Sequence, residues 1–207
     1  MDSGNTNMRI RPAAFKRLLA EVRSCTLCAA HLPNPPKPIL RAAPSARVLI
    51  VGQAPGRRVH ETGIPWNDPS GDLLRDWLGI DRDVFYDERR IAIIPAGFCY
   101  PGTGKSGDLP PRPECAPLWH PRLRALLPEI RLTLLVGSYA QAYYLGSRRK
   151  KTLAETVCRR DEYLPEFFPL PHPSPRNRLW LKRNAWFEAE ALPQLRRLFR
   201  ASLRNML

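Results

Sequence analysis

Apolar residues gather in four short runs along this chain of 207 residues. The runs are RVLIV at 47–51, RIAIIPAGF at 90–98, RLTLLVGS at 131–138 and the first part of LPEFFPLPHPSPRN at 164–177. A compact apolar run that ends at Gly or Pro predicts a strand buried on both faces. Apolar residues at helical spacing predict helices between and around these strands, at 12–24, 70–80 with Ser70 as N-cap, 115–130, 138–146 and 184–203. Strands that alternate with helices predict a three-layer α/β/α sandwich with a central, mostly parallel four-stranded sheet.

Three of the predicted strands end in loops rich in Gly and Pro. These loops are GQAPG at 52–56, AGFCYPG at 96–102 and PHPSPRN at 171–177. Because Gly and Pro mark any turn, each loop could also be an ordinary connection. In a parallel α/β sheet, however, the loops at the carboxyl ends of the strands build the ligand site. We therefore expect one shared site at this edge of the sheet.

The chain carries a large surplus of positive charge. It has 33 Lys and Arg against 19 Asp and Glu, which gives a net charge of +14. It is 43% hydrophobic with five Trp, so it can bury a core and is not a disordered basic tail. The surplus predicts a polyanionic partner, with general solubility as the alternative.

The ends of the chain and its longest apolar runs bear on compartment and domain count. No apolar run approaches the roughly 20 residues that span a bilayer, so we expect no membrane partner. The first residues, MDSGNTNMRIRP, lack the apolar centre of a secretion signal, which favours the cytoplasm. We predict a disordered N-terminus at 1–11 and a single domain at 12–207.

Four of the five cysteines have the order expected of a metal site. Cys25 and Cys28 form a C-x-x-C pair, and Cys99 and Cys115 flank a Pro/Gly-rich loop. Four thiolates could hold an iron–sulfur cluster or zinc. Ordinary buried thiols and a redox C-x-x-C are the alternatives. Cys158 lies in a predicted helix and is the spare.

The loops and cysteines together resemble the uracil-DNA glycosylase superfamily. VGQAPG resembles its motif A, PHPSPRN resembles its motif B, and IPWNDPSGDLL lies between them at the expected place. The four cysteines are similar in order and spacing to the iron–sulfur branches, families 4 and 5, whereas HPSPRN is most like family 3. The resemblance covers about residues 18–200. It implies hydrolysis of the N-glycosidic bond of uracil or another damaged base in DNA, with the base flipped into a pocket.

The resemblance assigns the motif A loop to the water and the base. Its residues here are Gly52, Gln53, Ala54, Pro55 and Gly56. Gln53 stands where family 4 carries Glu, and Ala54 stands where family 1 carries its catalytic Asp. Asp68 resembles the proposed catalytic Asp of family 5, so we expect it to position water or to stabilise the sugar cation; a loop Asp that starts a turn is the alternative. His60 and Glu61 are reserve candidates.

The resemblance also assigns the groups that hold the base. Trp66 aligns with the aromatic residue that stacks on the flipped base, and His172 with the His that hydrogen-bonds the developing base anion. Iron–sulfur members carry an Asn before the third cysteine that reads the uracil edge, but here Pro95 and Ala96 stand there. Asn67, Gln53 or backbone groups could substitute, so hypoxanthine, xanthine or an oxidised pyrimidine are alternatives to uracil.

The segment after His172 is strongly basic and is implied to contact DNA. The residues assigned to this role are Ser174, Arg176, Asn177, Arg178, Lys182 and Arg183. A solvated helix start is the alternative. Further basic residues, at 57–58, 105, 112 and 148–151, are expected on the same side of the molecule.

These observations predict a monomeric, monofunctional DNA glycosylase, because no lysine nucleophile is indicated. Its cysteines would hold a structural cluster, expected to be [4Fe–4S], with zinc as the alternative. Three other classes stay open: a weakly catalytic or non-catalytic binder of damaged or abasic DNA, a hydrolase acting on RNA or free nucleotides, and a zinc-stabilised nucleic-acid-binding module.

Overall fold

A four-stranded parallel sheet forms the centre of the molecule. The computed structural model describes residues 12–105 and 107–204. The sheet has the order β2-β1-β5-β6, and every pairing is parallel. The strands span Val48–Val51 (β1), Ile91–Ile93 (β2), Leu132–Val136 (β5) and Phe167–Leu170 (β6). The predicted α/β fold and its four strands are therefore confirmed.

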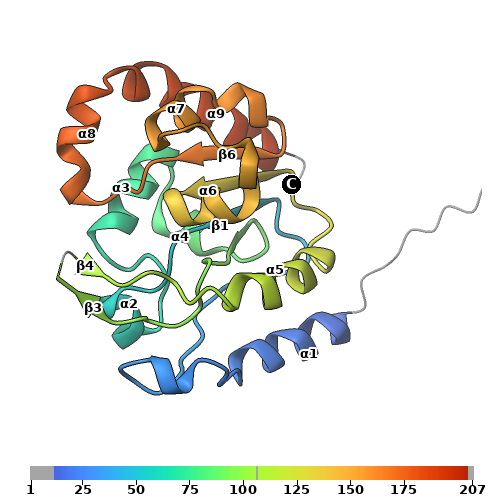
Figure 1. Cartoon of the computed structure of the whole chain (residues 1–207). Coiled ribbons are helices and arrows are strands. Elements are labelled where there is room, and N and C mark those ends of the chain that lie inside the picture. Colours follow the sequence, from blue (N-terminus) through green and yellow to red (C-terminus); the bar gives the residue numbers. More distant parts are fainter. Residues whose placement is uncertain (1–11, 106, 205–207) are drawn as a thin grey trace, which may run out of the picture.

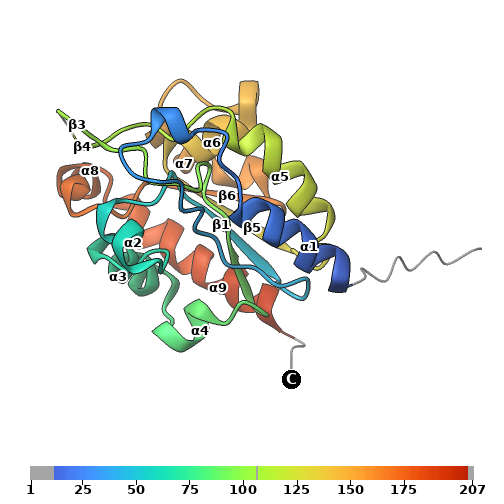
Figure 2. The same ribbon diagram turned by 90° about the horizontal axis from the view of Figure 1, so that it is seen from below.

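The sheet is buried on both faces, because alternate strand residues enter two separate cores. Leu49 and Val51 pack into one core, and Val48 and Ile50 pack into the other. The first core is closed by α1 (Pro12–Arg23), α5 (Cys115–Ala125) and α6 (Ser138–Leu145). The second is closed by α3 (Pro69–Leu78), α4 (Arg82–Tyr86), α7 (Leu153–Cys158) and α9 (Leu192–Leu203). Figure 2 shows α1 and α5 on the opposite side of the sheet from α3, α4 and α9.

The N-cap of α3 lies two residues earlier in the chain than predicted. Asp68, not Ser70, is the N-cap: its Oδ1 accepts a hydrogen bond of 2.9 Å from the backbone N–H of Gly71, and Pro69 occupies the first turn. A carboxylate in this position satisfies one of the unpaired N–H groups of the helix start. Asp68 therefore does start a turn of the chain, as the alternative interpretation expected, and this does not exclude a further role for its carboxylate.

Several short elements lie outside the predicted pattern. They are α2 (Arg57–Thr62), α4, α8 (Arg178–Arg183) and a hairpin of β3 (Thr103–Gly104) and β4 (Gly107–Asp108). The closing helix is preceded by a π-helical turn at Phe187–Ala191, and 3₁₀ turns occur at Ala29–His31, Gly146–Arg148, Arg160–Tyr163 and Pro175–Asn177. In Figure 1, α2, α8 and the hairpin gather on the side to which the strand arrows point.

Two expectations concern the chain ends and membranes. The predicted disordered segment 1–11 lies outside the described residues. Among the residues that the structure describes, no helix is both long enough and apolar enough to cross a membrane.

Candidate active site

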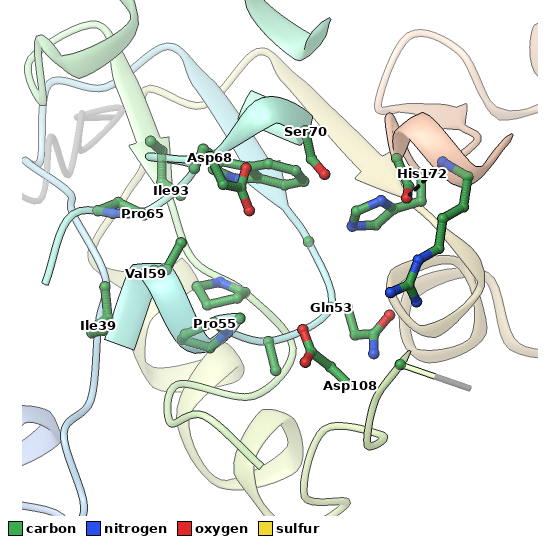
Figure 3. A pocket seen from close by; sticks show the side chains of 18 of the residues that line it. Ile39, Gln53, Pro55, Val59, Pro65, Asp68, Ser70, Ile93, Asp108 and His172 are labelled. Carbon is green, nitrogen blue, oxygen red and sulfur yellow. Dashed lines mark hydrogen bonds between the residues drawn. The ribbon is translucent and has the colours of Figure 1, made fainter. Parts of the chain in front are cut away.

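A cavity of about 430 Å³ opens at the carboxyl ends of the parallel strands (Figure 3). β1 pairs with β2 on one side and β5 on the other, so the chain reverses its winding direction here, and such a switch point forms a crevice. The volume is in the range of small-molecule sites. The cavity brings together most of the predicted site residues: Gly52, Gln53, Ala54, Pro55, Gly56, Trp66, Asp68, His172, Ser174, Arg176 and Asn177.

Trp66 forms an aromatic wall of the cavity, and two glycines make room for it. Its φ of 58° lies in the left-handed region, which is uncommon for a residue with a large side chain. A Cβ on Gly52 would lie 2.8 Å from the indole Cζ2, and a Cβ on Gly71 would lie 1.8 Å from the Trp66 carbonyl oxygen. The indole can therefore lie against the end of β1 only because Gly52 has no side chain.

Side chains of α3 and α4 hold the loop that carries Trp66. Arg75 is only 4% exposed, and its Nη1 donates to the Trp66 carbonyl at 3.3 Å. The Tyr86 hydroxyl donates to the Pro65 carbonyl at 2.9 Å. Arg75 also packs over Phe85, with 5.2 Å between its guanidinium carbon and the ring centroid. These contacts fix a backbone conformation that would otherwise be strained.

His172 follows β6 and faces Trp66, with 5.6 Å between the ring centroids. Its carbonyl accepts a 2.8 Å hydrogen bond from Asn177 Nδ2. Burial lowers the pKa of His172, and the nearby charge of Asp68 opposes that change in part. The imidazole is therefore neutral at pH 7, and one of its ring nitrogens can donate a hydrogen bond into the cavity.

Among the described residues that line the cavity, the carboxylates are Asp68 and Asp108, which point into it from opposite sides in Figure 3. Burial raises the pKa of Asp108; Arg176 acts against this change and Asp68 reinforces it. Asp108 is not among the residues predicted from sequence. The sequence feature that could have indicated Asp108 is its place directly after Gly107, in the long loop between Cys99 and Cys115.

The motif A loop is tied to its neighbours by backbone and amide groups. The backbone carbonyl of Gln53 accepts a 2.9 Å hydrogen bond from the Gly97 N–H. The side-chain Nε2 of Gln53 donates to the backbone carbonyl of Leu109 at 3.4 Å. On the side of β2, the cavity is lined by Ile93 and Pro95, which offer no side-chain amide. The side-chain amides that line the cavity include Gln53 and Asn177.

Some predicted site residues lie outside the cavity. Asn67 accepts a 3.1 Å hydrogen bond from Arg82 Nη2 through its Oδ1 and does not line the walls. Arg178, Lys182 and Arg183 are exposed on α8, beside the cavity rather than in it. The structure adds Leu179 on the same helix, whose exposure of 66% is high for a large apolar side chain.

The predicted basic run at 148–151 lies away from the cavity, so its expected placement is wrong. The Arg148 carbonyl accepts from the Tyr163 hydroxyl at 2.9 Å, and its guanidinium lies 5.9 Å from the ring of Phe167, the first residue of β6. The run 148–151 therefore lies near the amino end of the sheet. Arg112 lines the cavity formed by the cysteines instead.

Cys25, Cys28, Cys99 and Cys115 line a second cavity, next to Phe98 and Trp119. Burial raises the pKa of Cys99 to about 11 and that of Cys115 to about 12, so both thiols stay protonated unless a bound cation displaces the protons. Within 12–105 and 107–204, no group of three or more His, Cys, Asp or Glu is placed to hold a metal ion. Four thiols around one cavity nevertheless match the donor set of an iron–sulfur cluster. Cys158 is exposed on α7.

The fold and this site define an α/β protein with a cavity lined by an indole, an imidazole and two carboxylates, beside the exposed basic residues of α8. The family model of the uracil DNA glycosylase superfamily matches residues 41–196, which is most of the chain. The chain belongs to this superfamily.

Two similar proteins share only a low sequence identity with this chain. A type-4 uracil-DNA glycosylase of Sulfurisphaera tokodaii is 24% identical over 142 residues, which cover 63% of this chain. The match spans 61% of that protein's own length, which is less than two thirds of it. A solution NMR structure from Methanosarcina acetivorans, described as a "putative Uracil DNA glycosylase", is 20% identical, with a TM-score of 0.47 over 77% of this chain and 97% of the other.

Proposed function

We propose that the protein is a DNA glycosylase of base-excision repair that hydrolyses the N-glycosidic bond of uracil or another deaminated or damaged base. The observation that carries this proposal is the pairing of Trp66 and His172, with rings 5.6 Å apart, in a cavity that Asp68 also lines. An aromatic wall, a neutral hydrogen-bond donor and a carboxylate are the groups that base excision requires.

Each of these side chains has a defined task in the proposed reaction. The base leaves the stack, enters the cavity and stacks on Trp66. As the glycosidic bond breaks, negative charge develops on the base, and the neutral His172 donates a hydrogen bond to it. Positive charge develops on the sugar, and the carboxylate of Asp68 stabilises it. Asp68 uses Oδ1 to cap α3, which fixes the carboxylate in place.

The segment from motif B to α8 is the proposed DNA face. Arg176, Arg178, Lys182 and Arg183 would contact phosphates, and Ser174 and Asn177 would hold the loop that carries them. Leu179 stands exposed among these cations. An apolar side chain in this position could enter the gap that the flipped base leaves.

We propose that Cys25, Cys28, Cys99 and Cys115 hold an iron–sulfur cluster with a structural role. The four thiols would bind the iron of a cluster as thiolates, and the charge of that iron would favour the loss of their protons. The cluster would tie the segment after α1 to the loop that carries the hairpin and to the start of α5.

The lesion preference follows from the walls of the cavity. Ile93 of β2 and Pro95, which follows that strand, line this side of the cavity, so no side-chain amide of the described residues reads the base edge from there. Gln53 and Asn177 can do so from two other sides. We therefore propose uracil as the first substrate and allow for hypoxanthine, xanthine and oxidised pyrimidines in the same cavity.

A lesion panel tests the proposed function. Single- and double-stranded oligonucleotides, each with one modified base, are incubated with the full chain and scored for strand scission after alkali. We expect scission at uracil or another lesion. The excision rate should fall by about 100-fold or more in Asp68→Asn, because this variant lacks the negative charge that stabilises the sugar cation. Asp83→Asn is a matched control, because Asp83 is an exposed acid on α4 outside the cavity. Absence of base release from every lesion would reject the enzyme.

A non-catalytic binder of damaged or abasic DNA is the second candidate. One observation favours it: Gln53 and Ala54 stand in the motif A loop where acids are expected, and Asp68 already caps a helix. Tight binding to an abasic duplex, together with no base release from the panel, would support this candidate.

A further inference from the structure

The motif A loop contains no acidic residue, but a carboxylate from another segment of the chain lies beside it. Gln53 and Ala54 are both uncharged, so the loop itself offers no base for a water molecule. A Cβ placed on Gly56 would lie only 3.1 Å from Asp108 Oδ2. A carboxylate from a different segment of the chain therefore lies against the backbone of this loop.

The hairpin holds Asp108 in this position. Asp108 is the last residue of β4 and pairs with Thr103 of β3. The next residue, Leu109, donates its N–H to the Gly102 carbonyl at 2.8 Å and accepts from Gln53 Nε2 at 3.4 Å through its own carbonyl. The hairpin is thus bonded at its base and also to the motif A loop, so the carboxylate is placed by two elements.

The charged and titratable groups around Asp108 are Arg176, Asp68 and His172. The Arg176 side chain packs over Gly107, where a Cβ would meet Nη1 at 2.6 Å, and its charge favours the ionised form of Asp108. The partial burial of the Asp108 carboxylate, together with the charge of Asp68 on the opposite side, favours the protonated form. His172 lines the far wall and is neutral. The pKa of Asp108 is therefore raised even though the cationic Arg176 lies beside it. A carboxylate with a raised pKa is suited to act as a general base.

The position of Asp108 also fits the place of the sugar. Trp66 and His172 line the cavity at the ends of β1 and β6, where the base would lie. Asp108 stands on the hairpin and lines the cavity, and part of its side chain is open to solvent, so it lies at the rim of the cavity. A flipped nucleotide that inserts its base keeps its deoxyribose at the mouth, because the sugar stays joined to the strand.

We propose that Asp108 is a second catalytic carboxylate, which positions the attacking water and accepts its proton. The inference rests on the proposed function of the site. The water oxygen bonds to C1′ while the bond from C1′ to the base nitrogen breaks and its electron pair leaves with the base. The water proton passes to Asp108 and then to solvent, and the base anion takes a proton from solvent. The products are the free base and an abasic sugar.

Asp108→Asn in the full chain tests the inference on the lesion that the wild type excises best. The single-turnover excision rate should fall about 100-fold or more, the usual contribution of a general base. The dissociation constant for lesion DNA should change by less than about threefold, because the amide keeps the shape of the side chain. Asp108→Glu, which keeps a carboxylate, should retain more activity than Asp108→Asn. Asp83→Asn, with the same loss of charge on α4, should behave as the wild type.

The outcomes separate this inference from the proposed function. If the wild type releases no base, the proposed function fails. If the wild type is active and Asp108→Asn keeps its rate within about threefold, the inference is overturned and Asp68 acts alone. A rate for Asp108→Glu below that of Asp108→Asn would also overturn it, since shape and not acidity would then matter.

Discussion

At the scale of single residues, His172 shows how burial sets chemistry. A histidine in solution is half protonated near pH 6.5. In this cavity, burial disfavours the charged form more strongly than Asp68 favours it, so the pKa falls. The protonation state that the proposed reaction needs is therefore a property of the folded site and not of the residue type.

The pKa of His172 can be measured directly by NMR titration of its ring protons, assigned with a His172→Gln variant. Because the pKa is lowered, we expect the ring to stay neutral as pH falls through 6.5 and to protonate only below it. Asp68→Asn removes the charge that favours protonation, so its titration should shift to still lower pH. A midpoint at or above 6.5 in the wild type would contradict the buried, neutral imidazole.

At the scale of elements, the loop before α3 depends on residues that follow it in the chain. Tyr86 and Arg75 bind the carbonyls of Pro65 and Trp66, so α3 and α4 hold the aromatic wall. Neither Tyr86 nor Arg75 is among the residues that line the cavity. Their effect on a substrate is therefore indirect, through the position of the indole.

Tyr86→Phe removes one of these anchors and keeps the ring. The lost hydrogen bond is worth about 1 kcal/mol, so we expect excision efficiency to fall about fivefold through weaker binding of the flipped base. Steady-state kinetics should show the change mainly in KM. Tyr139→Phe is the matched control, because Tyr139 is exposed on α6 away from the cavity. Equal effects of both variants would refute the anchoring role.

Elements with a repeating pattern could be predicted from the sequence, and the short ones could not. Four buried strands were visible because a continuous apolar run such as VLIV, bounded by polar residues and Gly, is typical of a buried strand. The hairpin has two residues in each strand and α4 has five residues, which is too short for any period. Asp108 was missed for this reason, since only the hairpin brings it to the cavity.

The identity of the α3 cap shows a second limit. Ser70 and Asp68 are both good caps, and the choice depends on where Pro69 can sit. In the structure, Pro69 occupies the first turn, which moves the cap back to Asp68. Likewise, Asn67 was expected at the base edge, but Arg82 from α4 takes its oxygen. Contacts between elements of this kind leave no trace in local sequence.

At the scale of the whole molecule, the positive charge is distributed over both ends of the sheet. Lys182 stands on α8 beside the cavity, whereas Lys151 belongs to the run near the amino end of the sheet. Under the proposed function, we expect the first group and not the second to contact DNA whose flipped base occupies the cavity. The net charge of +14 therefore overstates the charge of the binding face.

Salt dependence of DNA binding distinguishes the two ends. Lys182→Ala should weaken binding and lower the slope of log affinity against log salt by about 1, because one phosphate contact and its released counterion are lost. Lys151→Ala removes the same charge at the other end and should leave the slope unchanged. A slope that falls equally in both variants would contradict a binding face limited to the cavity side.

The four cysteines join distant parts of the chain, so their loss should act on the whole molecule. Cys28→Ser should lower the iron and sulfide content and the broad visible absorption of the purified protein, and should reduce its thermal stability. Cys158→Ser is the control, because Cys158 is exposed and lies outside the cavity of the cysteines. Full iron loading of the Cys28→Ser protein would exclude this residue as a ligand, and zinc in the wild type would favour the zinc module.

The walls of the main cavity are drawn from residues as far apart in sequence as Ile39 and Asn177. No fragment of the chain that lacks either segment contains them all, so the cavity exists only when the complete sheet has formed. A free base that fills it would bind the folded state alone and would raise the midpoint of thermal unfolding as its concentration rises. Excised product would thus protect the protein that released it against unfolding, and a simple melting screen of free nucleobases would rank the lesions without any DNA.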